Sequence, residues 1–177
     1  HHHGSSSDRL SMPPVNIAVA GAGVIGRAHI AVIAQSSQCR LSAIADPSEA
    51  AQALAQEHGV PWFATLDQLL AAVSPDGVIL ATPNAMHVPQ ALQCIAAGVP
   101  VLVEKPIAHT VADAQKLVQA TQAHQAKVLI GHHRAHSPIM RQAKAVIDEG
   151  RLGQLVSVVG SAMFYKPDDY FTQAPWR

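Results

Sequence analysis

The sequence predicts a doubly wound α/β fold, in which helices cover both faces of a parallel sheet. Short runs rich in Val, Ile and Leu alternate with alanine-rich segments of helical pattern. The apolar runs are nearly continuous and do not alternate with polar residues, which is typical of strands buried on both faces. Because consecutive parallel strands need a crossover connection, strand–helix repetition of this kind favours a parallel sheet.

The strands are expected where β-branched and apolar residues cluster between turn residues. In chain order these segments are VNIAVA at 15–20, LSAIAD at 41–46, PWFA at 61–64, GVILAT at 77–82, VPVLVE at 99–104, AKVLIGHH at 126–133 and QLVSVVGSAMFY at 154–165. The last run is the longest, and no further strand follows it to serve as a partner.

The helices are expected between these strands, with ends that follow local chemistry. Their ranges are 24–36, 47–59, 66–73, 87–98, 110–125 and 137–150. Ser48 and Thr110 can accept hydrogen bonds from the first-turn N–H groups of two of them. Gly59, Gly98 and Gly150 suit the left-handed conformation that often follows a helix.

Composition and charge exclude several classes of protein. The chain has 177 residues, of which 49% are hydrophobic and 14% charged, with zero formal net charge. It can therefore form a core, and nothing in its charge suggests a nucleic-acid or membrane partner. We expect residues 1–11 to be a tag and linker, residues 12–133 a nucleotide-binding domain, and residues 134–177 the start of an incomplete second domain. Two widely separated cysteines fit reduced thiols in a cytoplasmic protein.

The first expected strand ends in GAGVIG, which matches the G-x-G-x-x-G pattern of Rossmann dinucleotide-binding folds. Gly21 permits a tight turn, Gly23 lets the backbone approach a pyrophosphate, and Gly26 lets helix and strand pack closely. We predict that Ala22, Val24 and Ile25, the other residues of the motif, also contact the dinucleotide. The alternative is a tight strand–helix turn without a ligand.

An acidic residue ends the second expected strand. Asp46 lies twenty positions after Gly26, near the spacing of a carboxylate that binds a ribose hydroxyl. With Pro47 and Ser48 next in sequence and no arginine nearby, this carboxylate favours NAD over NADP because it repels a 2′-phosphate. The alternative role of Asp46 is to cap the following helix, which Ser48 could also do.

Three more strand ends carry polar residues at the edge where open parallel sheets bind ligands. Thr82, Pro83, Asn84 and His87 follow the fourth strand; the alternative is a helix cap by Asn84 with His87 solvated. Glu104-Lys105-Pro106 ends the fifth strand, where a surface ion pair is the alternative. The sixth strand ends in GHHRAHSP, and its histidines are expected to lie in a loop rather than to bind metal, because no third ligand is evident.

Taken in order, GAGVIG, Asp46, ATPNAMH, VLVEKP and GHHRAHSP resemble the Gfo/Idh/MocA family of oxidoreductases. The resemblance implies a nicotinamide-dependent dehydrogenase or reductase acting on a small-molecule sugar, cyclitol or related polyol. It implies that Lys105 is the catalytic lysine beside the nicotinamide, and that Glu104 positions the cofactor or orients the amine. It further implies that the residues after the fourth strand contact the cofactor, and that Arg134, Trp176 and Arg177 approach its nicotinamide half.

The proposed chemistry of Lys105 is physically reasonable. A free lysine is protonated at neutral pH, but desolvation beneath a substrate and beside a positive nicotinamide ring favours loss of its proton. Pro106 restricts the residue before it to extended geometry, so we expect the amine to point out of the sheet edge.

The sequence departs from the family pattern because members continue for another domain, which carries substrate groups and a second acid–base residue. We therefore expect the chain to bind cofactor and to turn over poorly by itself, with a homo-oligomer in the full-length form. A dinucleotide-sensing regulator of the same fold remains an alternative. So does another Rossmann reductase, related to biliverdin or dihydrodipicolinate reductases.

Overall fold

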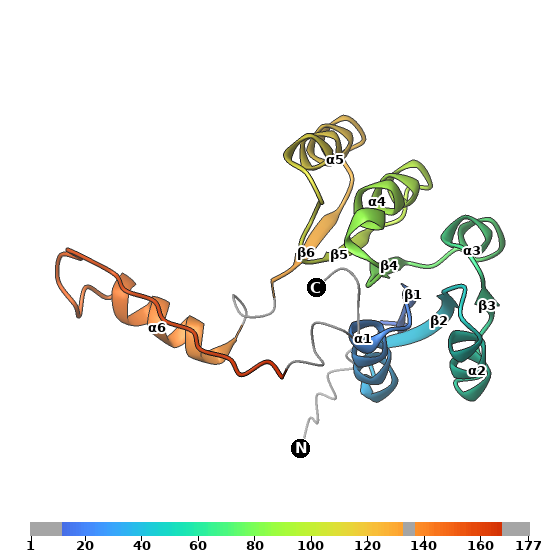
Figure 1. The fold of residues 1–177 in the computed structure, drawn as a ribbon, viewed down its shortest axis with the longest axis horizontal. Coiled ribbons are helices and arrows are strands. Elements are labelled where there is room, and N and C mark those ends of the chain that lie inside the picture. The colour runs from blue at the N-terminus through green and yellow to red at the C-terminus, as the bar shows by residue number, and fades with distance from the viewer. Residues whose placement is uncertain (1–11, 133–136, 168–177) are drawn as a thin grey trace, which may run out of the picture. The chain divides into compact units, whose positions relative to one another are not determined.

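The computed structural model describes residues 12–132 and 137–167, and the chain divides into two compact units, residues 1–132 and 133–177. The first unit contains a six-stranded sheet of order β3-β2-β1-β4-β5-β6, in which every neighbouring pair is parallel (Figure 1). Its elements are β1 (Val15–Ala20), α1 (Val24–Gln35), β2 (Cys39–Ala45), α2 (Glu49–Glu57), β3 (Trp62–Phe63), α3 (Leu66–Ala72), β4 (Gly77–Leu80), the 3₁₀ helix η1 (Asn84–Met86), α4 (His87–Ala96), β5 (Val101–Glu104), α5 (Val111–Ala123) and β6 (Val128–Gly131).

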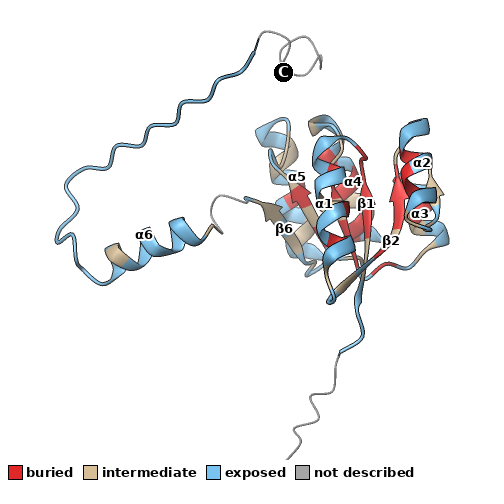
Figure 2. Ribbon diagram, turned by 90° about the horizontal axis from the view of Figure 1, so that it is seen from below, coloured by how far each residue is buried: buried red, intermediate tan, exposed pale blue. Residues whose placement is uncertain are grey.

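Helices cover both faces of this sheet, as the sequence predicts. Figure 1 shows α1 and α2 on one face and α3, α4 and α5 on the other. Alternate residues of β1 belong to the cores on the two faces of the sheet. Val19 packs with α1 and α2, whereas Ala18 and Ala20 pack with α3, α4 and α5. The buried residues therefore concentrate in the strands and the inner helix faces (Figure 2). The doubly wound Rossmann fold is confirmed, and its strand order reverses between β1 and β4, where such folds bind ligands.

The helix ends confirm the local chemistry expected of them. The side chains of Ser48 and Thr110 accept hydrogen bonds from first-turn N–H groups, and Thr65 does the same for α3. Gly59 and Gly98 have positive φ values of 66° and 70°. Strand β1 has the predicted bounds, and β2 begins two residues earlier and ends one residue earlier than predicted. The other four strands are shorter than predicted, because residues at their predicted ends belong to the connecting turns.

The second unit contains the amphipathic helix α6 (Pro138–Asp148), whose first turn is capped by the Ser137 side chain. A strand at 154–165 is not found: residues 155–167 have no regular secondary structure, and most of their apolar side chains are exposed. The physical reason is that a strand needs a hydrogen-bonded neighbour, and the described residues of this unit supply none. This prediction from the apolar run was wrong.

No helix in the described ranges is both long and apolar enough to cross a lipid bilayer.

Candidate functional site

The glycine turn after β1 is packed tightly against backbone at Gly21 and Gly26 and is open at Gly23. Gly21 has φ of +95°, and a Cβ there would lie 2.4 Å from the carbonyl oxygen of Ala81. A Cβ on Gly26 would lie 1.8 Å from the carbonyl oxygen of Gly21. By contrast, a Cβ on Gly23 would meet nothing within 4 Å. The outer glycines thus fit the backbone together, and the middle one leaves open space beside the turn.

Helix α1 begins directly at this open space. Its N-cap is Gly23, which supplies no side-chain hydrogen bond, and Val24 and Ile25 in the first turn are exposed. Without a capping side chain, first-turn N–H groups are left for a ligand or water. The dipole of the helix adds partial positive charge at the same point, which suits an anionic group.

Asp46 joins the tips of β1 and β2. Its Oδ2 accepts a hydrogen bond from the Ala22 N–H at 2.8 Å, and its Oδ1 accepts one from the Ser48 N–H at 2.8 Å. Burial opposes ionisation of this carboxyl. Hydrogen bonds from Ser48 and Ala22 and the charge of Arg27 nevertheless outweigh burial and hold the pKa of Asp46 below its usual value. The carboxylate is therefore ionised at neutral pH.

The structure tests two statements made about Asp46. The alternative role of Asp46 as the cap of α2 does not hold, because the Ser48 hydroxyl accepts from the Ala51 N–H at 3.1 Å. The expectation that no arginine lies nearby was wrong, because Arg27 acts electrostatically on Asp46. The sequence pattern missed this arginine because it lies nineteen residues earlier, directly after Gly26, and reaches the β2 tip only through the fold. Its Nε donates to the Ala22 carbonyl at 3.1 Å.

A groove of about 550 Å³ opens beside Asp46, between the tips of β2 and β4. It is lined by Ala45, Asp46, Pro47, Ala64, Thr65, Leu66, Asp67, Thr82, Pro83, Ala85, Met86, Pro89, Gln90 and Gln93. The sequence analysis identified Asp46, Thr82 and Pro83 as contacts and missed the other lining residues, apolar and polar, which carry no motif. A hollow of about 410 Å³ near His58 and Arg40 lies away from the carboxyl edge and contains none of the predicted site residues.

The segment after β4 differs from the expectation. Asn84 starts η1 and forms no side-chain cap, so the alternative role of Asn84 as a helix cap does not hold. His87 is not solvated: it is 1% exposed, and its two ring nitrogens lie 2.7 Å from the Pro106 carbonyl oxygen and 2.8 Å from that of Thr82. Both nitrogens are occupied by the backbone, so any contribution of His87 to a ligand site is indirect.

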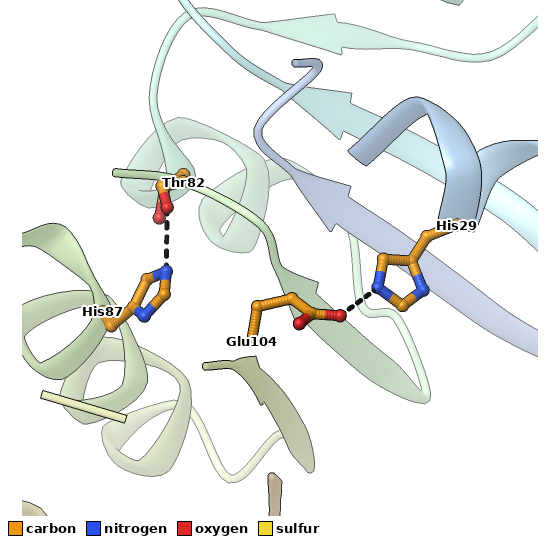
Figure 3. A network of polar contacts seen from close by, with 4 residues as sticks. All are labelled: His29, Thr82, His87 and Glu104. Atoms are coloured by element: carbon orange, nitrogen blue, oxygen red, sulfur yellow. Dashed lines mark hydrogen bonds and ion pairs between the residues drawn. The ribbon is translucent and has the colours of Figure 1, made fainter. Parts of the chain in front are cut away.

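Glu104, at the tip of β5, bonds across the sheet to α1. Its Oε1 lies 2.6 Å from Nε2 of His29, and the two side chains are 16% and 27% exposed (Figure 3). Gly131 on β6 makes room for the carboxylate, since a Cβ there would lie 2.9 Å from Glu104 Cδ. Among the ion pairs of residues 12–132, none joins Glu104 to Lys105, so the surface ion pair considered from sequence is absent.

Lys105 follows Glu104 and is exposed, and its peptide bond to Pro106 is cis. His29 was missed by sequence analysis, although it lies three residues after Gly26, on the same helix. Arg134, Trp176 and Arg177 lie outside the described residues. Within the described ranges there is no cluster of three or more His, Cys, Asp or Glu side chains that could hold a metal ion.

Comparisons with known proteins agree on one family. Residues 15–132 match the family model described as "Oxidoreductase family, NAD-binding Rossmann fold" (GFO_IDH_MocA). The chain is 31% identical over 147 residues to the rhizopine catabolism protein MocA of Rhizobium meliloti, covering 83% of this chain and 46% of that protein. It is 31% identical over 166 residues to an inositol 2-dehydrogenase of Rhizobium meliloti, covering 90% and 49%.

A solved structure is similar over almost the whole chain. The WlbA dehydrogenase of Bordetella pertussis, crystallised with NADH and UDP-GlcNAcA, matches with a TM-score of 0.87 and 29% identity, covering 93% of this chain and 48% of that one. The chain thus spans about half the length of the curated relatives that it matches.

Proposed function

The chain belongs to the oxidoreductase family with an NAD-binding Rossmann fold, and from this premise we propose what the whole protein does. It transfers hydride between a nicotinamide cofactor and a CH–OH group of a sugar, cyclitol or related polyol. One observation carries the proposal: the glycine turn, the Asp46 carboxylate and the turn bearing Lys105 all follow strands that end at one edge of the sheet.

The residues at this edge fit a dinucleotide. The open space at Gly23 and the uncapped first turn of α1 suit the pyrophosphate. The groove beside Asp46, with its aliphatic lining from Pro83, Met86 and Pro89, suits an adenosine group. Because ribose hydroxyls can donate to the ionised Asp46, this end of the groove favours NAD. Arg27 close by reduces that preference without removing it, since it offsets part of the negative charge.

Bound nicotinamide supplies a carbon that accepts or donates hydride, and the chain supplies the groups that handle the proton. During oxidation of an alcohol, the Lys105 amine accepts the hydroxyl proton while the carbon–hydrogen bond gives up hydride. During reduction the ammonium returns that proton to the carbonyl oxygen. Glu104 cannot take part freely, because His29 already holds its carboxylate.

The substrate class rests on relatives and on the chain's length. The relatives named above include an inositol 2-dehydrogenase and a dehydrogenase crystallised with a nucleotide sugar, so polyhydroxylated substrates are the class that we propose. Residues beyond the span of this chain then supply most substrate contacts and a second acid–base group. By itself the chain binds cofactor and turns over poorly, and the full-length form is a homo-oligomer. Both cysteines are free thiols, in keeping with a cytoplasmic location.

Binding to the dinucleotide tests the first half of this proposal. Calorimetric titration of the 177-residue chain should show binding of NADH, and weaker binding of NADPH. Absence of binding to either would contradict the proposal. Rapid oxidation of a polyol by this chain alone would contradict only the expectation that it needs further residues.

A lysine variant tests the second half, in a full-length form screened against cyclitols, sugars and nucleotide sugars. Lys105→Ala should abolish turnover while NADH affinity is largely kept. Lys127→Ala is a matched control, because Lys127 is exposed and precedes β6, at the opposite edge of the sheet. Unchanged activity in Lys105→Ala would favour a dinucleotide-sensing regulator instead.

A further inference from the structure

His87 is the most deeply buried histidine among the described residues. It is the first residue of α4, and its ring lies between the backbone that follows β4 and the backbone that follows β5. Figure 3 shows its contact with Thr82. The ring thus contacts the ends of two separate strands, which suggests a role in holding them together.

The two contacts define the chemistry of the ring. Carbonyl oxygens accept hydrogen bonds and cannot donate them. The distances of 2.7 Å to the Pro106 carbonyl and 2.8 Å to the Thr82 carbonyl are those of hydrogen bonds. The ring is therefore within hydrogen-bond distance of both carbonyls, and a ring nitrogen that carries a proton donates to the carbonyl beside it.

The two carbonyls belong to segments with different proposed roles. Thr82 lines the groove beside Asp46, and Pro106 directly follows Lys105. Helix α4 holds Thr82 a second time, because the Thr82 hydroxyl donates to Oε1 of the buried Gln90 at 2.5 Å. The first two turns of α4 therefore fix the groove segment through two side chains, and His87 alone extends this hold to the Pro106 carbonyl.

We propose that His87 is a positioning residue, whose ring fixes the Lys105–Pro106 turn relative to the Thr82 segment by bridging the Pro106 and Thr82 carbonyls. The inference rests on the proposed function, because it gives Lys105 its role. His87 touches neither cofactor nor substrate; it acts by holding the amine-bearing turn where the nicotinamide half of a bound dinucleotide would be. Loss of the ring would leave the cofactor groove in place and release the turn.

The first test uses the unmodified chain. Nuclear magnetic resonance of 15N- and 13C-labelled protein should show a coupling across a hydrogen bond from a ring nitrogen of His87 to the carbonyl carbon of Thr82 or Pro106, and contacts of the ring protons with both segments. A ring coupled to neither carbonyl, or in contact with only one of the two segments, would overturn the proposal. Because this measurement needs no substitution, it holds even if variants at this buried position fail to fold.

The second test asks whether the ring acts through Lys105. Each lysine is labelled competitively with acetic anhydride, with and without NADH, and quantified by mass spectrometry. NADH should slow acetylation of Lys105 and leave Lys116 and Lys127, both exposed elsewhere, unaffected. In a folded His87→Gln variant that still binds NADH, protection of Lys105 should be lost. The control His58→Gln, at the end of α2, should keep it.

The outcomes separate the two proposals. Full protection of Lys105 in folded His87→Gln would overturn the positioning role and leave the proposed function standing. Failure of the wild-type chain to bind NADH, or to protect Lys105 when NADH is bound, would overturn the proposed function and the positioning role with it.

Discussion

The two halves of the candidate site are held together in different ways. At the tips of β1 and β2, the fit is made by backbone: Gly21 and Gly26 leave no room for a Cβ, and Asp46 accepts from two backbone N–H groups. At the tips of β4 and β5, it is made by two histidine side chains from α1 and α4.

This difference predicts how each half tolerates change. Backbone packing cannot relax around an added atom, so a single methyl group at the wrong glycine is costly. Side-chain bonds can be removed singly, so changes at β4 and β5 should give smaller, graded effects. Four experiments test the contrast, from the largest expected effect to the smallest.

The largest effect is expected at Gly26. Gly26→Ala would place Cβ 1.8 Å from the Gly21 carbonyl oxygen, and separating α1 from the turn should lower the free energy of unfolding by about 3 kcal/mol. Chemical denaturation of both proteins measures this. The matched control is Gly23→Ala, where Cβ has open space and φ is −75°. It should keep its stability and lose NADH affinity; equal stability in both variants would contradict the packing argument.

The His29–Glu104 pair should show an intermediate effect. Breaking a short, half-buried hydrogen bond to a charged group should lower the free energy of unfolding by about 1 kcal/mol, given partial exposure of both side chains. His29→Ala, Glu104→Gln and the double variant form a thermodynamic cycle that isolates the coupling. Lys116→Ala, which breaks an exposed pair with Asp113, serves as the control. A coupling of zero would mean that the His29–Glu104 contact adds nothing to stability.

Gly131→Ala should have a small effect on stability and a clear one on geometry. The added Cβ would lie 2.9–3.0 Å from the carboxylate atoms of Glu104 and displace that side chain from His29. The stability lost by this displacement is partly offset, because alanine in a strand is better by about 0.5–1 kcal/mol than glycine. The 15N and 1H shifts of the His29 ring report the displacement directly. Gly77, where a Cβ would have ordinary contacts, offers a control glycine in β4.

The smallest effect is expected in how the free energy of unfolding changes with pH under acidic conditions. The pKa of Asp46 is lower in the folded chain than its ordinary value near 3.8. A lowered folded pKa contributes stability above the unfolded value, and this contribution is lost as pH falls from about 4 through the folded pKa. Asp46→Asn should therefore flatten the pH dependence of unfolding in this window. The lowered pKa of Asp113 is present in both proteins and cancels. Parallel pH profiles would show that Asp46 gains nothing from its hydrogen bonds.

The fold and one half of the site could be predicted because their signals are local. Continuous apolar runs, helix caps and the spacing of Gly21, Gly26 and Asp46 all act over short stretches of chain, and they gave the sheet and the first turn correctly. The partners of Glu104 and His87 lie 75 and 19 residues away and carry no spacing rule. For this reason the sequence did not show that His87 is buried: it left open a cofactor contact and a solvated side chain. The apolar run at 154–165 misled for the opposite reason, since its pattern implies a paired strand and the described residues of its unit, 137–167, provide no partner.

The close contact of Gly21 with Ala81 restricts how chains of this kind can be recombined. A chimera that takes β1, the turn and α1 from one parent and β4 from another combines two backbone segments that do not pack together in either parent. Because the gap admits no extra atom, even a small mismatch in the path of the second parent would force the turn open. Crossover points placed after β4 keep this three-part junction within one parent, and they should yield folded hybrids far more often than those placed between α1 and β4.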